Sequence, residues 1–454
     1  MLQSINPLNQ KIIQTYKEHS LREVNHIIAE VDSEFTNWKR SNFNERTKLL
    51  KNTASILRKN IDEYSKIITM EMGKSIRESR AEIEKCAWVC EYYAENGEHF
   101  LAPKIVNTDA KKSYVSFQPL GVILAVMPWN FPFWQVFRFA APTLMAGNVG
   151  ILKHSSNVSG CALTIEQIIH AAGFPKNTFR TLLINNNMVA SIIENPFVKA
   201  VTLTGSTPAG KAVASKAGNM LKKTVLELGG SDPYIILKDA DLEQAAGSCS
   251  ISKLINAGQS CIAAKRIIVE EPVVHKFQSL LSQNMQEVRM GDPFDERTDI
   301  GPMARSDLRD ELHQQVLNSV KLGAKLLLGG QTPDDKGAFY PPTILTDVKP
   351  GMPAFDEELF GPVAAIVPAK DENEAIALAN NSIFGLGAAI FCKDASHGEK
   401  IAAEKLDAGC CFVNDFVRSD PRLPFGGIKQ SGYGRELSDF GIREFVNIKT
   451  VYVK

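Results

Sequence analysis

The chain contains 454 residues, and its 51 lysines and arginines are balanced by 51 aspartates and glutamates, so its formal net charge is zero. A neutral chain lacks the broad basic field of most nucleic-acid-binding proteins, and we expect no nucleic-acid partner. No stretch approaches the roughly 18 apolar residues of a membrane-spanning helix, and the first residues lack the apolar core and cleavage site of a signal peptide. We therefore predict a cytoplasmic protein without a membrane partner, in which the eight cysteines are reduced. The histidines are scattered and neither CxxC nor HExxH occurs, so no metal site is predicted.

The predicted elements fall into zones along the chain. Residues 1–100 are rich in charged side chains, and apolar positions recur at helical spacing over 32–60 and 60–94. The alternating stretch Tyr114–Phe117 predicts a strand. Short runs of Val, Ile and Leu then alternate with helical segments, and such runs are typical of parallel strands buried on both faces. The runs are VILAVMP, VGILKH, FRTLLI, KAVTLTG, TVLELGG, PYIIL, RIIVEE, AKLLLGG, AAIVPA, GAAIFC and GCCFVN, and the chain ends in the strand NIKTVYVK. We predict an α/β fold of two parallel-sheet lobes with an extended β arm.

A glycine-containing turn is the first candidate for a ligand site. Open α/β sheets bind ligands at the carboxyl ends of their strands, yet the GxGxxG fingerprint is absent. The strand 200–204 is followed by Gly205, Ser206 and a helix that begins near Pro208. This helix N-terminus could face a phosphate, although a plain turn fits the pattern equally well.

Two further segments could contribute to such a site. Lys153 follows the strand 149–152, where it could bond a ribose hydroxyl or a phosphate, or remain a solvated lysine. In EELFGP, Glu358 offers a carboxylate for a ribose diol and Phe360 an aromatic ring for a flat ligand. The alternative for this segment is a charged helix end that stops at Gly-Pro.

Three side chains have the chemistry of acyl transfer. Cys261 follows a Gly-containing turn, where a thiolate could attack a carbonyl carbon, although most cysteines are inert core residues. Glu227 ends an apolar strand, and burial would raise its pKa and make it a general base, unless it only caps the following Gly-Gly turn. Asn130 lies between two prolines and could donate to an oxyanion, or be an ordinary turn residue.

Together these segments resemble the aldehyde dehydrogenase superfamily along essentially the whole chain. The matching motifs, in chain order, are PWNFP (128–132), LK (152–153), TGSTPAG (204–210), LELGG (226–230), GQSC (258–261), EELFGP (357–362), PFGGIKQSG (424–432) and GRE (434–436). The resemblance implies NAD- or NADP-dependent oxidation of an aldehyde to a carboxylic acid. It also implies a Rossmann-like cofactor domain over 1–108 and 119–228, a catalytic domain over 229–438 and an oligomerisation arm over 109–118 and 439–454. A homodimer or homotetramer is then expected.

The resemblance also implies roles for individual residues. Cys261 attacks the aldehyde to give a thiohemiacetal, whose oxyanion is held by the Asn130 amide and the Cys261 N–H. Glu227 then activates the water that hydrolyses the thioester, with Glu436 as a supporting carboxylate near the thiol. The cofactor residues implied are Trp129, Lys153, Ser156, Gly205, Ser206, Glu358 and Phe360.

Two positions depart from the usual family pattern. Ser156 stands where an acidic residue commonly repels a 2′-phosphate, so the neutral side chain admits NADP as well as NAD. Phe139 stands where many members have a lysine linked to proton relay. That role must fall elsewhere, and Glu436 is the candidate.

Several polar residues suggest an anionic substrate. Arg138 resembles the carboxylate-binding arginine of succinate-semialdehyde dehydrogenases, and Ser419 matches their hydroxyl ligand. Arg418 and Arg422 flank Ser419, whereas a second arginine of those enzymes is replaced here by Ile255. The alternative for Arg138 is a structural pair with an internal acid.

The sequence thus favours succinate semialdehyde, oxidised to succinate, as the small-molecule substrate. Another short carboxylated or aliphatic aldehyde is the first alternative. A cysteine hydrolase or acyltransferase that works without a nicotinamide, a non-enzymatic scaffold, and a CoA-dependent acylating relative are the others.

Overall fold

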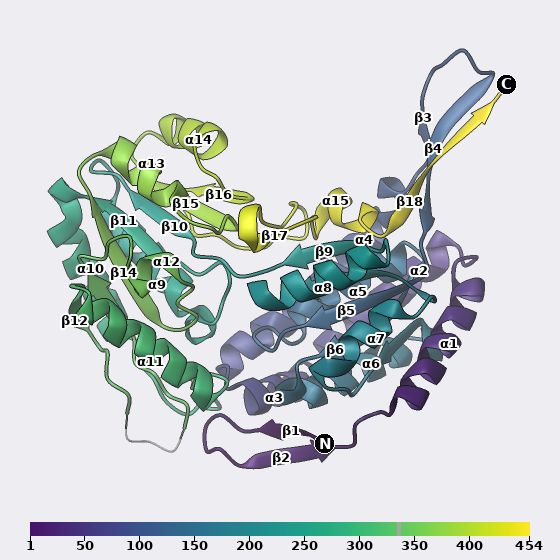
Figure 1. Cartoon of the computed structure of the whole chain (residues 1–454), viewed down its shortest axis with the longest axis horizontal. Coiled ribbons are helices and arrows are strands. Elements are labelled where there is room, and N and C mark those ends of the chain that lie inside the picture. The colour runs from purple at the N-terminus through teal and green to yellow at the C-terminus, as the bar shows by residue number, and fades with distance from the viewer. Residues whose placement is uncertain (334–336) are drawn as a thin grey trace.

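Two α/β lobes lie side by side in the computed structural model, which describes residues 1–333 and 337–454 (Figure 1). The first lobe holds a six-stranded sheet in the order β17-β9-β8-β5-β6-β7. The second lobe holds a seven-stranded sheet in the order β12-β13-β14-β11-β10-β15-β16. All neighbouring strands in the two sheets are parallel except at β12 and β17, which confirms the predicted fold class.

The strands of the first lobe follow the predicted apolar runs. They are β5 (Val122–Met127), β6 (Val149–His154), β7 (Phe179–Thr181), β8 (Val198–Thr204) and β9 (Lys223–Glu227). Because these strands are parallel, their carboxyl ends lie along one edge of the sheet. The connecting helices are α5 (Trp134–Met145), α6 (Ser159–Ala171), α7 (Val189–Glu194) and α8 (Thr207–Asn219), with short helices η1 (Ser156–Val158), η2 (Lys176–Thr178) and η3 (Asn186–Met188).

The charged N-terminal zone forms four helices that pack on this lobe. They are α1 (Leu21–Trp38), α2 (Phe43–Lys59), α3 (Ile61–Met72) and α4 (Ile76–Phe100). The predicted helical stretch 32–60 is interrupted because Asn42 caps α2, its side chain accepting from the Glu45 N–H at 2.9 Å. Gly73, at φ 82°, similarly ends α3 in the left-handed conformation.

The second lobe repeats the α/β pattern. Its strands are β10 (Pro233–Ile236), β11 (Arg266–Glu270), β12 (Lys325–Leu328), β13 (Thr343–Thr346), β14 (Val363–Ala369), β15 (Gly387–Phe391) and β16 (Cys410–Val413). Its helices are α9 (Leu242–Leu254), η4 (Ile255–Gly258), η5 (Glu271–Val273), α10 (Val274–Gln286), α11 (Ser306–Lys321), α12 (Pro353–Asp356), α13 (Glu372–Asn380) and α14 (Ala395–Glu404). Separate apolar clusters cover the two faces of the sheet.

The C-terminal part of the chain returns from the second lobe to the first. After η6 (Lys429–Ser431), the short strand β17 (Gly432–Tyr433) pairs antiparallel with β9, so Gly432 faces Glu227. The helix α15 (Ser438–Arg443) follows and packs against α4 and α5 of the first lobe, while β17 lies between the lobes in Figure 1. This return brings the PFGGIKQSG and GRE motifs beside the end of β9.

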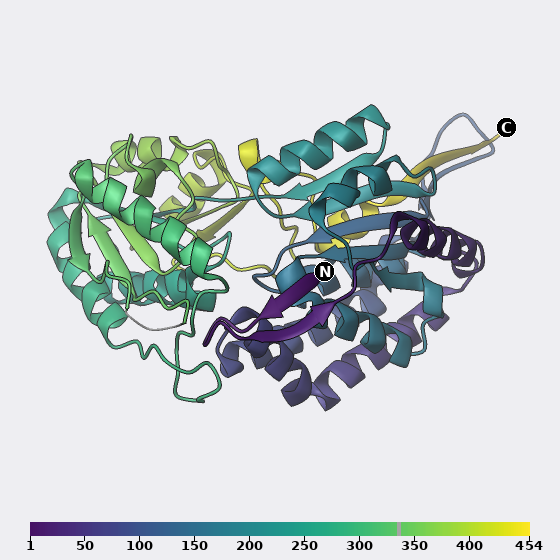
Figure 2. The same cartoon turned by 60° about the horizontal axis from the view of Figure 1, so that its bottom comes forward.

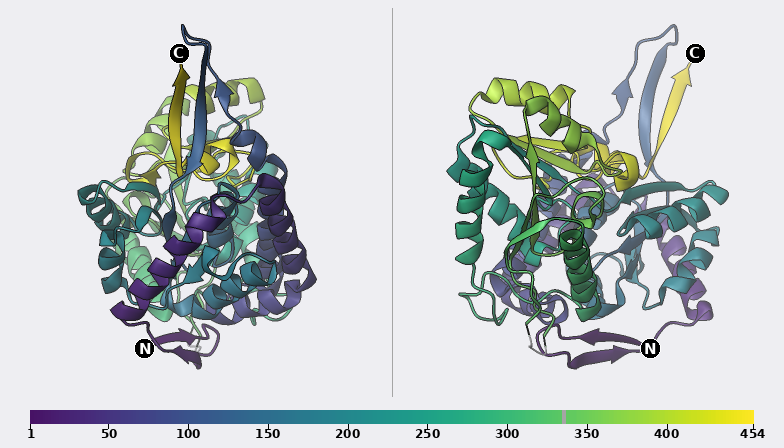
Figure 3. Two further views of the ribbon diagram at one scale, coloured as in Figure 1. Left: turned by 90° about the vertical axis from the view of Figure 1, so that its right-hand side faces the viewer. Right: turned by 60° about the vertical axis from the view of Figure 1, so that its left-hand side comes forward.

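An arm of three antiparallel strands projects from the body and carries the C-terminus (Figure 3). It consists of β3 (Lys104–Ile105), β4 (Lys112–Pro119) and β18 (Val446–Val453). The predicted Tyr114–Phe117 strand and the C-terminal strand pair along their length, from Val446 opposite Pro119 to Val453 opposite Lys112. β3 extends this sheet into residues that were expected to belong to the cofactor domain. The domain boundaries themselves stay a prediction.

A hairpin that the sequence analysis did not predict lies at the N-terminus, where Figure 2 shows it in front of the first lobe. It is formed by β1 (Leu2–Ile5) and β2 (Ile12–Tyr16). The buried carboxylate of Glu71 joins it to α6, since it accepts from Ser4, from the Tyr16 hydroxyl at 3.3 Å and from the Gly160 N–H at 2.9 Å.

Over the residues that the structure describes, no helix has the length and apolar character needed to cross a membrane. The same residues contain no cluster of three or more His, Cys, Asp or Glu side chains arranged to bind a metal ion.

Candidate active site

Two cavities meet at Cys261, at the carboxyl edge of the first sheet. The first cavity has a volume of about 290 Å³ and the second about 260 Å³. Cys261 and Gln135 line both of them. The thiol therefore lies between two spaces, one of which could hold a cofactor and the other a substrate. Among the predicted residues, the first cavity brings together Trp129, Asn130, Gly205, Ser206, Glu358 and Phe360.

The turn before Cys261 has an unusual backbone. Asn256, Ala257 and Gly258 have φ values of 57°, 51° and 74°, all in the left-handed region. Two of these residues are not glycine, so the turn stores strain of a kind that is common at active sites. The Asn256 side chain stabilises it by donating to the Asn130 carbonyl at 2.7 Å and to the Gln259 carbonyl at 3.1 Å.

The Cys261 thiol lies in a low-dielectric environment. Burial raises the pKa of the thiol to about 12, while the positive charges of Lys265 and Arg138 act in the opposite direction. A nucleophile in this setting needs a base or an additional positive influence to become a thiolate.

The Asn130 amide lies beside the thiol on the loop between β5 and α5. Its Nδ2 donates to the Gln259 carbonyl at 3.0 Å, which leaves the second N–H of the amide for another acceptor. The buried ring of His154 holds this loop, because its Nε2 lies 2.9 Å from the Pro132 carbonyl. Its Nδ1 lies 3.2 Å from the Met127 carbonyl and 3.0 Å from the Ser155 N–H, so both ring nitrogens contact the backbone. Burial lowers the pKa of His154 to about 4.

Glu227 and Glu436 flank the buried guanidinium of Arg138. Arg138 Nε forms an ion pair with Glu436, and Arg138 Nη2 lies 3.4 Å from the Thr204 hydroxyl. Burial and the charge of Glu436 raise the pKa of Glu227 well above its usual range, and burial also raises the pKa of Glu436. A carboxyl with a raised pKa can serve as an acid or base near neutrality.

The Glu227 carboxyl does not line either cavity as bounded by the described residues. It lies against Gly426, where a Cβ would stand 2.6 Å from Glu227 Oε1. Neither carboxyl oxygen has a hydrogen-bond partner among the described residues. The Glu227 side chain thus lies at the same carboxyl edge of the first sheet as the cavities, but it is turned toward the PFGGIKQSG segment. Phe139, where the family commonly has lysine, is a core residue that packs on Phe445 with ring centroids 6.2 Å apart.

The N-terminus of α8 faces the first cavity through Gly205 and Ser206. Ser206 caps this helix, its hydroxyl accepting from the Ala209 N–H at 3.4 Å. Such a helix end favours an anion. Lys153 and Ser156 lie at the end of β6, two strands away from β8, and are not among the described residues that line the cavity. Burial lowers the pKa of Lys153 to about 8, and its ammonium group donates to Asn186.

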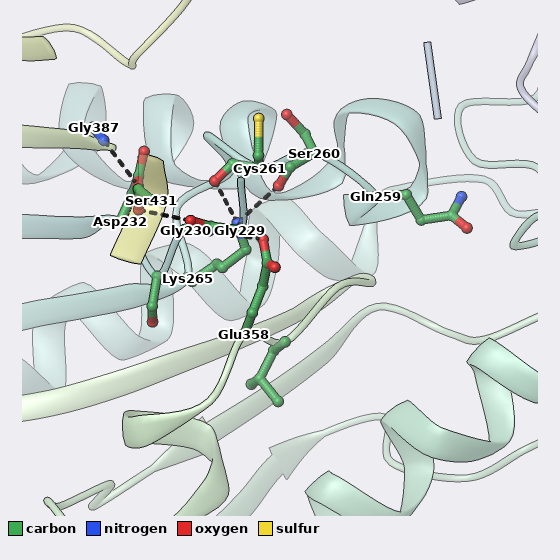
Figure 4. A network of polar contacts seen from close by, with 12 residues as sticks. Gly229, Gly230, Asp232, Gln259, Ser260, Cys261, Lys265, Glu358, Gly387 and Ser431 are labelled. Atoms are coloured by element: carbon green, nitrogen blue, oxygen red, sulfur yellow. Dashed lines mark hydrogen bonds and ion pairs between the residues drawn. The ribbon is translucent and has the colours of Figure 1, made fainter. Parts of the chain in front are cut away.

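Glu358 and Phe360 approach the first cavity from the second lobe. The Phe360 ring meets Trp129 edge-on, with centroids 5.7 Å apart. Glu358 accepts from the Gly230 N–H at 3.1 Å and forms an ion pair with the buried Lys265. Figure 4 shows this polar network beneath the thiol, with the Cys261 sulfur pointing away from Lys265.

Helix α4 contributes one polar face to the second cavity. Glu78, Glu82 and Lys85 occupy positions i, i+4 and i+7 and all line the cavity. Glu82 accepts from the Phe133 and Trp134 N–H groups at 2.8 and 2.9 Å, and thereby caps α5.

Lys85 is the cation of this face. Its Nζ donates to the Ser419 hydroxyl at 2.8 Å and stands 4.4 Å from the centroid of the Trp134 ring. Burial and the nearby charge of Arg138 lower the pKa of Lys85 to about 8. Within the described part of the chain, the ion pairs with a distance below 4.0 Å do not include Lys85.

The three arginines predicted near the substrate differ in their surroundings. Arg138 and Arg418 line the second cavity, but Arg138 is paired with Glu436 and Arg418 with Asp415 at 2.7 Å. Arg422 is exposed, pairs with Asp420 at 2.6 Å and is absent from the described lining of the cavity. The structure thus gives Arg138 the internal-acid pairing that the sequence left open. It offers no contact that would support substrate binding by Arg422.

Sequence reasoning missed Lys85 and Lys265. Lys85 belongs to no motif, and the available signal was the i, i+4, i+7 spacing of Glu78, Glu82 and Lys85, on a helix that carries other charged residues as well. Lys265 follows the nucleophile by four residues and immediately precedes β11. The available signal was a lysine directly before a buried strand.

Comparisons with known proteins agree with this geometry. The model of the "Aldehyde dehydrogenase family" matches residues 1–451. The chain is 49% identical, over 99% of both chains, to a "Probable succinate-semialdehyde dehydrogenase [NADP(+)]" of Synechocystis sp.. It is 45% identical, over 99% of both, to "Succinate-semialdehyde dehydrogenase [NADP(+)] 1" of Mycobacterium tuberculosis. The solved succinic semialdehyde dehydrogenase of Streptococcus pyogenes, in complex with NADP+, has a TM-score of 0.98 and 37% identity over 100% of both chains.

Proposed function

Because the chain belongs to the aldehyde dehydrogenase family, we propose that it oxidises succinate semialdehyde to succinate with NADP as its cofactor. The observation that carries the proposal is the Lys85 ammonium group, bonded to the Ser419 hydroxyl 2.8 Å away, in the cavity that ends at Cys261. A cation and a hydroxyl together recognise a carboxylate. The names of the relatives from Synechocystis and Mycobacterium tuberculosis point to the same substrate and cofactor.

The first cavity has the features that a nicotinamide dinucleotide needs. The capped N-terminus of α8 suits the phosphates, and the Glu358 carboxylate suits the ribose hydroxyls. Trp129 and Phe360 provide aromatic walls beside the thiol. The neutral, exposed Ser156 at the end of β6 favours NADP because it does not repel a 2′-phosphate. When bound, the nicotinamide accepts a hydride from the substrate carbon.

In the first half of the reaction, the Cys261 sulfur adds to the aldehyde carbon and a carbon–sulfur bond forms. As the C=O double bond becomes a single bond, the negative charge of the thiolate moves to the former carbonyl oxygen. The free N–H of the Asn130 amide and the Cys261 N–H are suited to hold this oxyanion. The Cys261 N–H donates to no other described residue, which leaves it available for this role. Loss of hydride leaves a thioester on Cys261.

In the second half, water replaces the sulfur. Glu227 removes a proton from this water after its side chain turns toward the thioester from its resting position, which the missing Cβ of Gly426 makes possible. The raised pKa of Glu227 suits a group that must first bind and then release a proton. Glu436, which is absent from the described lining of both cavities, and Arg138, which lines the second, act by setting the charge around Glu227.

The proposal is tested by measuring kcat/KM with succinate semialdehyde and with butanal, each with NADP and with NAD. The two aldehydes have four carbons and differ in the terminal carboxylate. We expect succinate semialdehyde and NADP to be preferred. Equal or better use of butanal would contradict the substrate. Hydrolysis of an added ester, with no oxidation of either aldehyde in the presence of the nucleotides, would favour a cysteine hydrolase. Acyl-CoA formation on adding CoA would favour an acylating relative.

We further propose that the arm joins copies of the chain into a homodimer or homotetramer. Ile448 and Tyr452 on β18 are 61% and 51% exposed, although both are large and apolar. β18 and β3 are also the edges of their sheet. Light scattering on the intact chain and on a variant that ends before β18 would determine the assembly. The cytoplasmic location stays a prediction.

A further inference from the structure

Lys265 connects the nucleophile to the carboxylate on the opposite side of the first cavity. Its Nζ donates to the carbonyl oxygen of Ser260 at 2.8 Å and of Cys261 at 2.6 Å, and lies 3.2 Å from Glu358 Oε1 (Figure 4). An ammonium group has three hydrogens, and these three acceptors use all of them. The side chain is only 1% exposed, so solvent does not compete for these contacts.

Two further contacts join the same segments. Lys253 Nζ donates to the Leu359 carbonyl at 3.1 Å. Gly258 packs so closely on Gly361 that a Cβ on Gly258 would stand 2.1 Å from the Gly361 oxygen. The nucleophile turn and the EELFGP segment therefore form one packed unit, in which Lys265 is the member that reaches Cys261.

We propose that Lys265 is a positioning residue that ties the Glu358 carboxylate to the peptide carbonyls beside the thiol, so that NADP bound at Glu358 is sensed by Cys261. The inference rests on the proposed function, in which Glu358 accepts from the ribose hydroxyls. Hydroxyl donors on Glu358 offset part of its negative charge. The positive charge of Lys265 is then less compensated at the neighbouring thiol, and the thiolate is favoured.

The charges that face Cys261 allow this effect. Lys265 and Arg138 favour the thiolate, whereas Glu358 and Asp232 disfavour it. Arg138 is already paired with Glu436, outside the first cavity. Asp232 is absent from the described lining of both cavities; its Oδ1 accepts from the Gly387 N–H at 3.0 Å, and burial raises the pKa of Asp232 to about 7. Glu358 is thus the opposing charge that lines the cavity and that a cofactor would contact.

Lys253 offers a matched control for the experiment. It is a second buried lysine that bonds the same segment, but at the Leu359 carbonyl rather than at the nucleophile turn. Burial lowers the pKa of Lys253 well below its usual range. Lys253→Met therefore removes a contact of the same kind and a side chain of the same size, but it removes less positive charge than Lys265→Met does.

The experiment measures the rate at which iodoacetamide alkylates Cys261, from about pH 6 to about pH 11, with and without saturating NADP+. Modification is quantified on the peptide that contains Cys261, because other cysteines also react. We expect NADP+ to lower the thiol pKa in the wild type. In Lys265→Met that response should be lost, with alkylation at least about tenfold slower in the presence of NADP+, which corresponds to one pKa unit. Lys265→Arg should restore most of the response, and Lys253→Met should retain it.

A wild-type response in a Lys265→Met protein that is folded and binds NADP+ would overturn the proposal. Equal loss in Lys253→Met would also overturn it, because packing alone would then explain the effect. If Lys265→Met does not fold, Lys265→Gln takes its place. If NADP+ does not change the pKa of the Cys261 thiol in the wild type, the proposal is refuted without any variant. Alkylation requires no turnover, so a preference for butanal would contradict the proposed substrate and leave this result standing.

Discussion

Replacing Lys85 with methionine should remove the preference for a carboxylated aldehyde over an uncharged one of the same length. Methionine keeps a long apolar side chain against the Trp134 ring, which lies 4.4 Å from the ammonium group in the wild type. The change removes the ammonium group that is bonded to the Ser419 hydroxyl. A substrate carboxylate would then have the hydroxyl but no adjacent unpaired cation.

The size of the effect follows from one charge-assisted hydrogen bond. Such a bond contributes about 1.5–3 kcal/mol, and each 1.36 kcal/mol changes a rate or binding constant tenfold. We therefore expect kcat/KM for succinate semialdehyde to fall by roughly 10- to 150-fold in Lys85→Met. The value for butanal should change little, because its methyl group makes no bond to the ammonium group.

The same preference should depend on pH. Lys85, whose pKa is lowered to about 8, is charged below that pH and neutral above it. The ratio of kcat/KM for succinate semialdehyde to that for butanal should therefore be constant at low pH and fall as the pH rises through about 8. Taking the ratio cancels the titration of Cys261 and Glu227, since both substrates share these groups.

The assay is the initial rate of NADPH formation, with Arg422→Met as the control. Arg422 is also a cation near Ser419, but it is exposed and paired with Asp420. Arg422→Met should keep the wild-type ratio at every pH. A flat ratio in the wild type across this range, or a wild-type ratio in Lys85→Met, would refute the role assigned to Lys85.

Other substitutions test the remaining groups. Glu227→Gln should lower kcat by about 10²–10⁴-fold and leave a stopped-flow burst of one NADPH per active site; an undiminished steady-state rate would contradict its role as base. Gly258→Ala should lower the free energy of unfolding in urea by more than about 2 kcal/mol, because of φ 74° and the 2.1 Å approach of its Cβ to Gly361; an unchanged midpoint would disprove that. The pKa of His154 is about 4 in the folded chain, so as the pH falls below about 6.5 this residue is protonated in the unfolded chain before it is protonated in the folded one. Protonation of His154 should therefore lower the free energy of unfolding by about 2 kcal/mol by pH 5. His154→Gln should lose less stability between pH 7 and pH 5 than the wild type, and parallel losses would refute this.

The sequence predicted the sheet strands well because buried parallel strands need near-continuous apolar runs. β5, β6 and β8 coincide with such runs, and the motif residues follow directly at their carboxyl ends. β13 escaped notice because Thr343 and Thr346 leave only a short apolar core between them. The hairpin of β1 and β2 was missed because its buried polar contact, Glu71, lies far along the chain.

The candidate site was predicted less evenly, because sequence motifs specify which residues are present but not how their side chains point. Gly205 and Glu358 were matched by motif and do meet in one cavity. The orientation of Glu227 toward Gly426 depends on contacts with a segment that lies far along the chain. Lys85 could be assigned only after α4 was packed against α5, since the helical pattern alone does not say which of its charged faces is buried.

The pairing of β17 with β9 has a consequence for the order in which the molecule folds. β9 ends at Glu227, and its partner Gly432 is synthesised roughly 200 residues later, so this is a long-range contact. At about 5–20 residues per second, the edge of β9 waits roughly 10–40 s on the ribosome for its neighbour. During that interval the strand carries unpaired backbone groups that can pair with other nascent chains. The edge that carries Glu227 is therefore completed only after Gly432 has been made, and chains truncated before Gly432 would be released with an open, association-prone sheet.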